Sequence, residues 1–113
     1  MMHEMSIAMN IVDIAVQTAQ KNGAHKINSI TVEIGALSGV VPEALEFCFE
    51  AATKETMAEG CRLEIVYLKA QAECSACGFK FETDQFLNLC PQCGEQVFAA
   101  GGQQLQVKAI NVD

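Results

Sequence analysis

Apolar side chains recur at helical spacing in the first twenty residues of this chain. They fall three or four positions apart, as one face of an amphipathic helix requires. The positions are Met5, Ala8, Met9, Val12, Ala15, Val16 and Ala19. The pair Asn22-Gly23 follows, and this is a common signal for the C-terminal end of a helix. We therefore expect a helix that ends near Asn22-Gly23 and has Met5 and Met9 on its core-facing side.

Three later segments alternate between apolar and polar positions, as half-buried strands do. They lie at residues 30–34, 63–67 and 105–112. Between the first two, Pro42 suits the first turn of a second helix, and Glu43 favours the positive end of that helix. A strand-helix-strand unit in one sheet favours parallel strands joined by a right-handed crossover.

Two Cys-x2-Cys pairs separate the second strand from the third. Cys74 and Cys77 form one pair, Cys90 and Cys93 form the other, and a glycine follows each pair. Two such turns, brought together by a hairpin, supply four thiolates at the corners of a tetrahedron, which is the ligand set of a closed structural zinc site. Two disulfides or two redox pairs are the alternatives. A closed zinc site lends folding energy and leaves no coordination position for a substrate.

Together these patterns predict an α+β fold in which two helices pack on a three-stranded mixed sheet that carries an inserted zinc-ribbon-like module. We expect a helix-sheet domain made of residues 1–70 plus 102–113. The zinc-binding module would span residues 71–101, and Gly101-Gly102 would form a hinge-like break at its end.

Charge and cysteine usage narrow the function. The 113-residue chain has 14 acidic and 7 basic residues, a formal charge of −7. Nucleic-acid binding needs a basic face, yet Lys80 is the only basic residue between Glu73 and Glu95. The N-terminal stretch has the pattern of neither a signal peptide nor a membrane span. Zinc-thiolate chemistry with two further cysteines, Cys48 and Cys61, fits a reducing cytoplasm.

The segment Met2-His3-Glu4 offers a second set of metal ligands. An amino-terminal nitrogen, deprotonated backbone amides and the His3 imidazole can close fused chelate rings in one plane. Nickel(II) and copper(II) favour this tetragonal nitrogen geometry. On these residues alone, a solvated histidine is the competing interpretation.

These motifs resemble those of the HypA/HybF nickel metallochaperones, and the resemblance runs nearly end to end. The matching segments are residues 2–6 (Met-His-Glu-Met-Ser), 32–35 (Val-Glu-Ile-Gly), 37–38 (Leu-Ser), 42–49 (Pro-Glu-Ala-Leu-Glu-Phe-Cys-Phe), 59–61 (Glu-Gly-Cys) and the paired cysteines. The sequence departs from the family at Met1, which precedes the usual start, and at residues 54–57, where relatives often carry Gly-Thr.

The resemblance implies a nickel chaperone and not an enzyme. Nickel(II) cargo would bind at the N-terminus through His3 and backbone nitrogens that include Glu4. Zinc would bind at the four paired cysteines. The implied partners are a HypB-type GTPase, the [NiFe]-hydrogenase large subunit and, in some organisms, urease maturation proteins. The alternative function is a zinc-ribbon module that binds protein or nucleic acid and has no role with nickel.

Two starting residues give two nickel sites. If Met2 is the first residue, which we favour, its amine joins the backbone nitrogens of His3 and Glu4 and the imidazole. If Met1 is retained, its amine, the amides of Met2 and His3, and the imidazole form an ordinary square-planar site that does not need Glu4.

Overall fold

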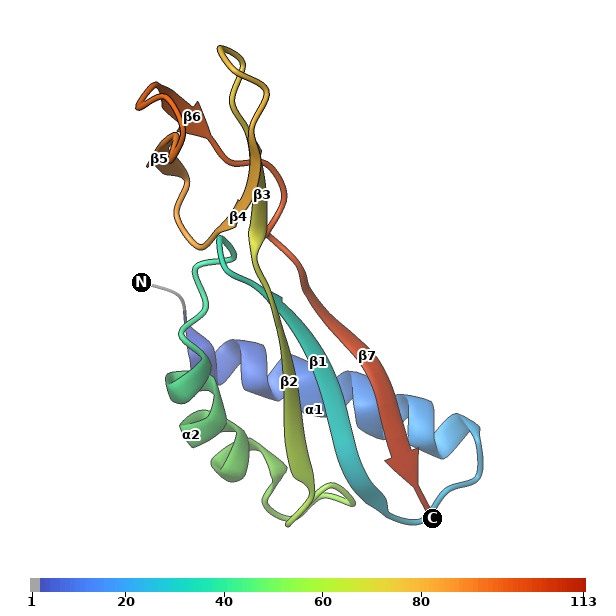
Figure 1. Cartoon of the computed structure of the whole chain (residues 1–113). Helices are drawn as coiled ribbons and strands as arrows, with labels where there is room; N and C mark the ends of the chain where they lie inside the picture. The colour runs from blue at the N-terminus through green and yellow to red at the C-terminus, as the bar shows by residue number, and fades with distance from the viewer. Residues whose placement is uncertain (1–2) are drawn as a thin grey trace.

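The computed structural model describes residues 3–113 and contains two helices and seven strands within that range (Figure 1). Their bounds in chain order are α1 (Glu4–Lys21), β1 (Ile27–Gly35), α2 (Pro42–Thr53), β2 (Arg62–Leu68), β3 (Ala70–Glu73), β4 (Lys80–Thr83), β5 (Leu87–Leu89), β6 (Gln96–Phe98) and β7 (Leu105–Val112). Neither described helix is both long enough and apolar enough to cross a membrane.

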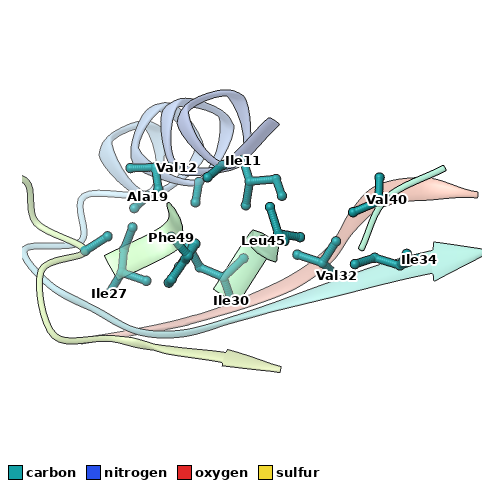
Figure 2. Close-up of a cluster of buried hydrophobic side chains, with 13 residues drawn as sticks. Ile11, Val12, Ala19, Ile27, Ile30, Val32, Ile34, Val40, Leu45 and Phe49 are labelled. Atoms are coloured by element: carbon teal, nitrogen blue, oxygen red, sulfur yellow. The ribbon is translucent and has the colours of Figure 1, made fainter. Parts of the chain in front are cut away.

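The helix-sheet body consists of α1, α2 and a three-stranded sheet in the order β2-β1-β7. Strand β1 pairs in parallel with β2 and antiparallel with β7, so the sheet is mixed. Both helices lie on the same side of the strands (Figure 2). The predicted α+β fold is confirmed, including the parallel pairing of the two strands that flank the second helix.

Branched aliphatic side chains fill the space between the helices and the sheet. Ile27, Ile30, Val32 and Ile34 of β1 are fully buried, as is Leu45 of α2 (Figure 2). A central strand with neighbours on both sides places this run at the middle of the body, where burial stabilises most. The core therefore rests on β1 and on the helix faces that cover it.

One face of α1 differs from the prediction. The buried line runs through Ala8, Ile11, Ala15 and Ala19, whereas Met5 and Met9 are exposed. Small residues on this line allow α1 to approach the sheet closely. The long methionine side chains lie one residue further along the helix, about 100° away from that line. Assigning Met5 and Met9 to the core was therefore wrong.

A register shift in β7 explains why its apolar pattern changes phase. Thr31 of β1 pairs with Ala109, but Val32 pairs with Val107, so Lys108 is an extra residue. A bulge of this kind inserts one residue and reverses the alternation beyond it. As a result Val107, Ile110 and Val112 all pack against the core.

The four short strands form a separate unit, the cysteine module, which spans residues 70–100 (Figure 1). It contains two hairpins, β3-β4 and β5-β6. Their buried contact surface is small and consists of Ala70, Ala72, Cys74, Cys90, Val97 and Ala99. The cysteine module lies at one end of an elongated molecule whose principal extents are 55 × 26 × 16 Å.

The junction between the two parts is tightly packed. Gly35 donates its N–H to Gln104 O, and Leu37 donates its N–H to Gly102 O. A Cβ atom at Gly35 would lie 2.1 Å from the Gly102 carbonyl oxygen, so only glycine fits this approach. Gly102 is itself buried. The predicted hinge at Gly101-Gly102 is therefore a close backbone contact in the structure.

Candidate metal centres

The two cysteine pairs adopt the same local conformation. In the first, Gly78 N–H donates to Cys74 O, and Cys74 N–H donates to Phe79 O. In the second, Gly94 N–H donates to Cys90 O, and Cys90 N–H donates to Glu95 O. Both glycines have φ +80°, a left-handed conformation that residues with a Cβ rarely adopt. The glycine after each pair is therefore what closes the turn.

The four sulfur atoms converge on one point. Cys74 Sγ lies 3.5 Å from Cys93 Sγ, and Cys77 Sγ lies 3.6 Å from Cys90 Sγ. All four ligand atoms lie within 4.8 Å of one another. A tetrahedral zinc with Zn–S bonds of about 2.3 Å requires sulfur atoms about 3.8 Å apart. The thiols of this module therefore match a closed four-sulfur zinc site.

The electrostatics of the cluster favour a bound cation. Burial opposes ionisation of Cys90, but the N–H groups of Cys93 and Gln92 outweigh it and lower the pKa of Cys90 to about 7. The Glu95 N–H favours the Cys93 thiolate, yet the neighbouring thiols and burial raise the pKa of Cys93 to about 12. Four thiols this close cannot all ionise by themselves, whereas a central dication stabilises every thiolate.

The other two cysteines lie away from this cluster. Cys48 and Cys61 are half-buried and pack against the core of the helix-sheet body. Burial raises the pKa of the Cys61 thiol. A raised pKa disfavours the reactive thiolate of Cys61, and the packing of both side chains against the core agrees with the expectation that they act as small hydrophobic residues.

His3 immediately precedes the first turn of α1, and its side chain is exposed. Its carbonyl oxygen accepts the first helical hydrogen bond, from Ile7 N–H. The imidazole therefore projects from a chain end that a rigid helix anchors. Met2, the third residue expected to bind nickel, lies outside the described residues. Within residues 3–113, His3 belongs to no cluster of three or more metal-ligating side chains.

Glu4 has a second feature that the sequence analysis missed. Its side chain is only 8% exposed, and one carboxylate oxygen accepts the Val41 N–H at 3.3 Å. Val41 is the N-cap of α2, and Glu4 lies in the first turn of α1. A carboxylate at this point stabilises the positive ends of both helices. The available signal was spacing, because Glu4 lies four residues before the buried Ala8.

Comparison with known proteins places the chain in a family. Residues 2–112 match the family model described as "Hydrogenase/urease nickel incorporation, metallochaperone, hypA". The hydrogenase maturation factor HypA of Geobacter metallireducens is 42% identical over 113 residues, which cover 99% of this chain and all of the relative. The hydrogenase maturation factor HypA of Geobacter sulfurreducens is 44% identical, with the same coverage.

A solved structure agrees with the sequence matches. The solution structure of the nickel metallochaperone HypA from Helicobacter pylori superposes with a TM-score of 0.65 and 26% identity, and the match covers 98% of this chain and 97% of that one. The family model and this solved structure thus place the chain in the class of metallochaperones. The chain belongs to the HypA family, as its resemblance to HypA/HybF proteins predicted.

Proposed function

We propose that this protein is a nickel chaperone that carries one nickel(II) ion at its N-terminus and delivers it during [NiFe]-hydrogenase maturation. Nickel is bound by the His3 imidazole and by backbone nitrogens that include Glu4. The observation that carries the proposal is the exposed imidazole directly before a packed helix. An open site of this kind can surrender its ion to a competing ligand, which a buried cage does poorly.

The Glu4 carboxylate supports the site without donating to the metal. Its hydrogen bond to Val41 fixes the first turn of α1 against the start of α2. This holds the backbone nitrogens of His3 and Glu4 at a constant position beside the exposed His3 imidazole. Glu4 therefore has a positioning role, in addition to the nitrogen ligand assigned to it.

The second metal is a structural zinc ion held by Cys74, Cys77, Cys90 and Cys93. The support is the convergence of all four sulfur atoms at distances that suit tetrahedral coordination. Four protein ligands leave no position for a substrate, so the zinc stabilises the cysteine module and performs no chemistry. We therefore assign the chain no catalytic residue and no enzymatic activity.

The partners follow from the family. The description of the family model names nickel incorporation into hydrogenase and urease, and relatives are named hydrogenase maturation factors. We infer that this chain acts with a HypB-type GTPase and the hydrogenase large subunit, and that urease maturation proteins are further recipients. Four thiolate ligands and two further free cysteines, Cys48 and Cys61, suit the reducing cytoplasm. The acidic surface disfavours nucleic acid as a partner.

Equilibrium nickel binding to the untagged, zinc-loaded chain tests this function. His3→Ala should abolish tight nickel binding and leave zinc content and the fold unchanged. His25→Ala is the matched control because His25, the only other histidine, is exposed and lies in the turn before β1. Binding should weaken as the pH falls, since only neutral imidazole binds metal. Equal nickel affinity of wild type and His3→Ala would refute the assignment.

The starting residue can be decided with the same protein. Intact-mass analysis identifies whether the native chain begins at Met1 or Met2, and we favour Met2. The site that starts at Met1 should release nickel more slowly, because its chelate rings close without strain. Identical spectra and release rates for both forms would contradict the proposed coordination.

A further inference from the structure

The outer strand of the cysteine module exposes large apolar side chains. Leu87 and Leu89 of β5 are 49% and 68% exposed, Phe98 of β6 is 61% exposed, and Phe86 is 58% exposed. Leu87 pairs directly with Phe98 across the hairpin, and the Phe86 and Phe98 rings lie 5.3 Å apart. These four side chains form the apolar patch of the hairpin.

The main chain beneath this patch also has free hydrogen-bonding groups. Ala99 N–H donates to Phe86 O, and Cys90 N–H donates to Glu95 O. The even-numbered residues of the segment 86–90 therefore direct their main-chain N–H and C=O groups toward β6. In an antiparallel pair the next residues direct their N–H and C=O groups the other way. Leu87 and Leu89 therefore point theirs toward the outer edge of β5, with which no other described strand pairs.

The strand is held in place from its inner face. Asn88 alternates with the two leucines, and its side-chain amide donates to Gln85 O at 2.9 Å. Its amide oxygen accepts the Thr83 hydroxyl at 2.6 Å. These bonds fix the turn that precedes β5. An edge that is already ordered loses little entropy when another strand adds to it.

Charge around the patch indicates what kind of segment fits it. Asp84 precedes the patch, and Glu95 precedes Gln96, the cross-strand partner of Leu89. The module as a whole has four carboxylates and one basic residue, Lys80. A second copy of this chain would bring like charges together, which disfavours self-association. A partner with lysine or arginine beside apolar side chains has the complementary charge.

We propose that the outer edge of β5 and the apolar patch form a docking site for an extended, basic segment of a protein partner. The segment adds as a third strand to the β5-β6 hairpin. Its main chain pairs with Leu87 and Leu89, and its alternate apolar side chains cover the patch. This site goes beyond the nickel role and uses none of the residues that bind metal.

The test uses the zinc-loaded full chain and a short synthetic peptide in which valines alternate with lysines. Binding should be saturable, should weaken as salt rises, and should shift the amide NMR signals of Leu87 and Leu89. Leu89→Gln should weaken binding by about tenfold, because apolar area is no longer buried. Met9→Gln, a matched change at an exposed residue of α1, should leave binding unchanged.

Two comparison peptides and one variant sharpen the result. A twin with glutamate in place of lysine should not bind, and a twin with N-methyl groups along its pairing edge should lose most of its affinity. His3→Ala should bind the peptide as wild type does, which separates this proposal from the nickel function. Failure of the lysine peptide to bind, equal binding of the glutamate twin, or a dimer that Leu89→Gln dissociates would overturn the proposal.

Discussion

The helix-sheet body and the cysteine module are stabilised by different physics. The helix-sheet body buries 13 hydrophobic residues in one cluster, among them several isoleucines, leucine and phenylalanine (Figure 2). The cysteine module buries only six, and apart from one valine these are alanines and cysteines. Since hydrophobic stabilisation scales with buried apolar area, the core of the cysteine module contributes much less folding free energy than the core of the helix-sheet body.

This difference in core size bears on the positions of the four cysteines and of the proposed nickel ligands. In the cysteine module, hairpin turns hold the four thiols in place, and a metal ion supplies stabilisation that the small core lacks. In the proposed nickel site the relation is reversed: the packed helix α1 is already stable, and the exposed His3 that precedes it would carry the metal ligand. The four cysteines would thus enclose a structural ion, whereas the proposed cargo ion would lie at an open chain end.

The largest expected effect comes from breaking the four-sulfur site. Cys90→Ser should lower zinc affinity sharply, because structural zinc contributes about 10–16 kcal/mol in small zinc-binding units. Amide exchange should show loss of protection over residues 73–95, with α1 and β1 still protected. Cys48→Ser is the control, since Cys48 lies outside the cluster. Loss of protection throughout α1 and β1 would show that the two parts are not separable.

Truncating a buried side chain in the helix-sheet body should have the opposite effect: the body should lose stability, and the zinc site should remain intact. Leu45→Ala removes a fully buried side chain and should lower the free energy of unfolding by about 2–5 kcal/mol. Phe47→Ala, on the same helix but 82% exposed, should change it by less than about 0.5 kcal/mol. Zinc content measured under native conditions should stay at one per chain in both variants. Loss of zinc from Leu45→Ala would mean that the module depends on the core of the helix-sheet body.

The Glu4 carboxylate should have an intermediate effect. Glu4→Ala leaves the Val41 N–H without its partner and should cost about 1–3 kcal/mol of stability in urea unfolding. Nickel affinity should fall less than in His3→Ala, because the backbone nitrogen of residue 4 is still present. Unchanged stability together with nickel affinity as low as that of His3→Ala would instead make the carboxylate itself a ligand.

The smallest expected effect is a change in stability with pH that arises from Glu33, on the solvent-facing side of the sheet. The Gln106 amide, 2.6 Å from Glu33, lowers the pKa of that carboxyl against opposing burial, and Lys108 lowers it further. A lowered pKa stabilises the fold above the ordinary glutamate pKa of about 4.3, and this contribution is lost as the pH falls through the lowered value. Glu33→Gln should therefore be less stable than wild type near neutral pH, and the difference should vanish in acid.

Urea unfolding at several pH values measures this effect. Glu59→Gln, at an exposed residue that lies outside the elements of the sheet, is the matched control. A stability difference between wild type and Glu33→Gln that stays constant from neutral to acid pH would contradict the assigned pKa shift.

Periodicity and turn chemistry predicted most of the fold, because they are local properties. The strands β1 and β2 and helix α1 followed from residue spacing, helix α2 from Pro42 and Glu43 at its start, and the parallel pairing from the strand-helix-strand order. The misplaced methionines and the bulge at Lys108 depend on how closely α1 and β7 approach their neighbours, which spacing does not encode. The tight contact of Gly35 with Gly102 joins residues far apart in sequence, so no local pattern could have revealed it.

The candidate sites differ in the same way: one follows from local sequence, and the other depends on contacts between distant segments. Two Cys-x2-Cys pairs with following glycines encode their own geometry, and the sulfur atoms converge as predicted. The carboxylate of Glu4 acquires its partner only when α1 and the start of α2 meet in space. The nickel ligands at His3, Glu4 and Met2 remain a prediction that rests on residue chemistry and on the family.

X-ray absorption at the nickel edge, on the zinc-loaded chain with one added nickel(II) ion, tests the central claim of two separate metal sites. We expect nickel surrounded by nitrogen and oxygen ligands, with the scattering pattern of one imidazole and no sulfur shell. Zinc-edge data on the same sample should retain four sulfur neighbours. Sulfur ligands on nickel, or loss of sulfur from zinc, would contradict this assignment and place the cargo in the cysteine module.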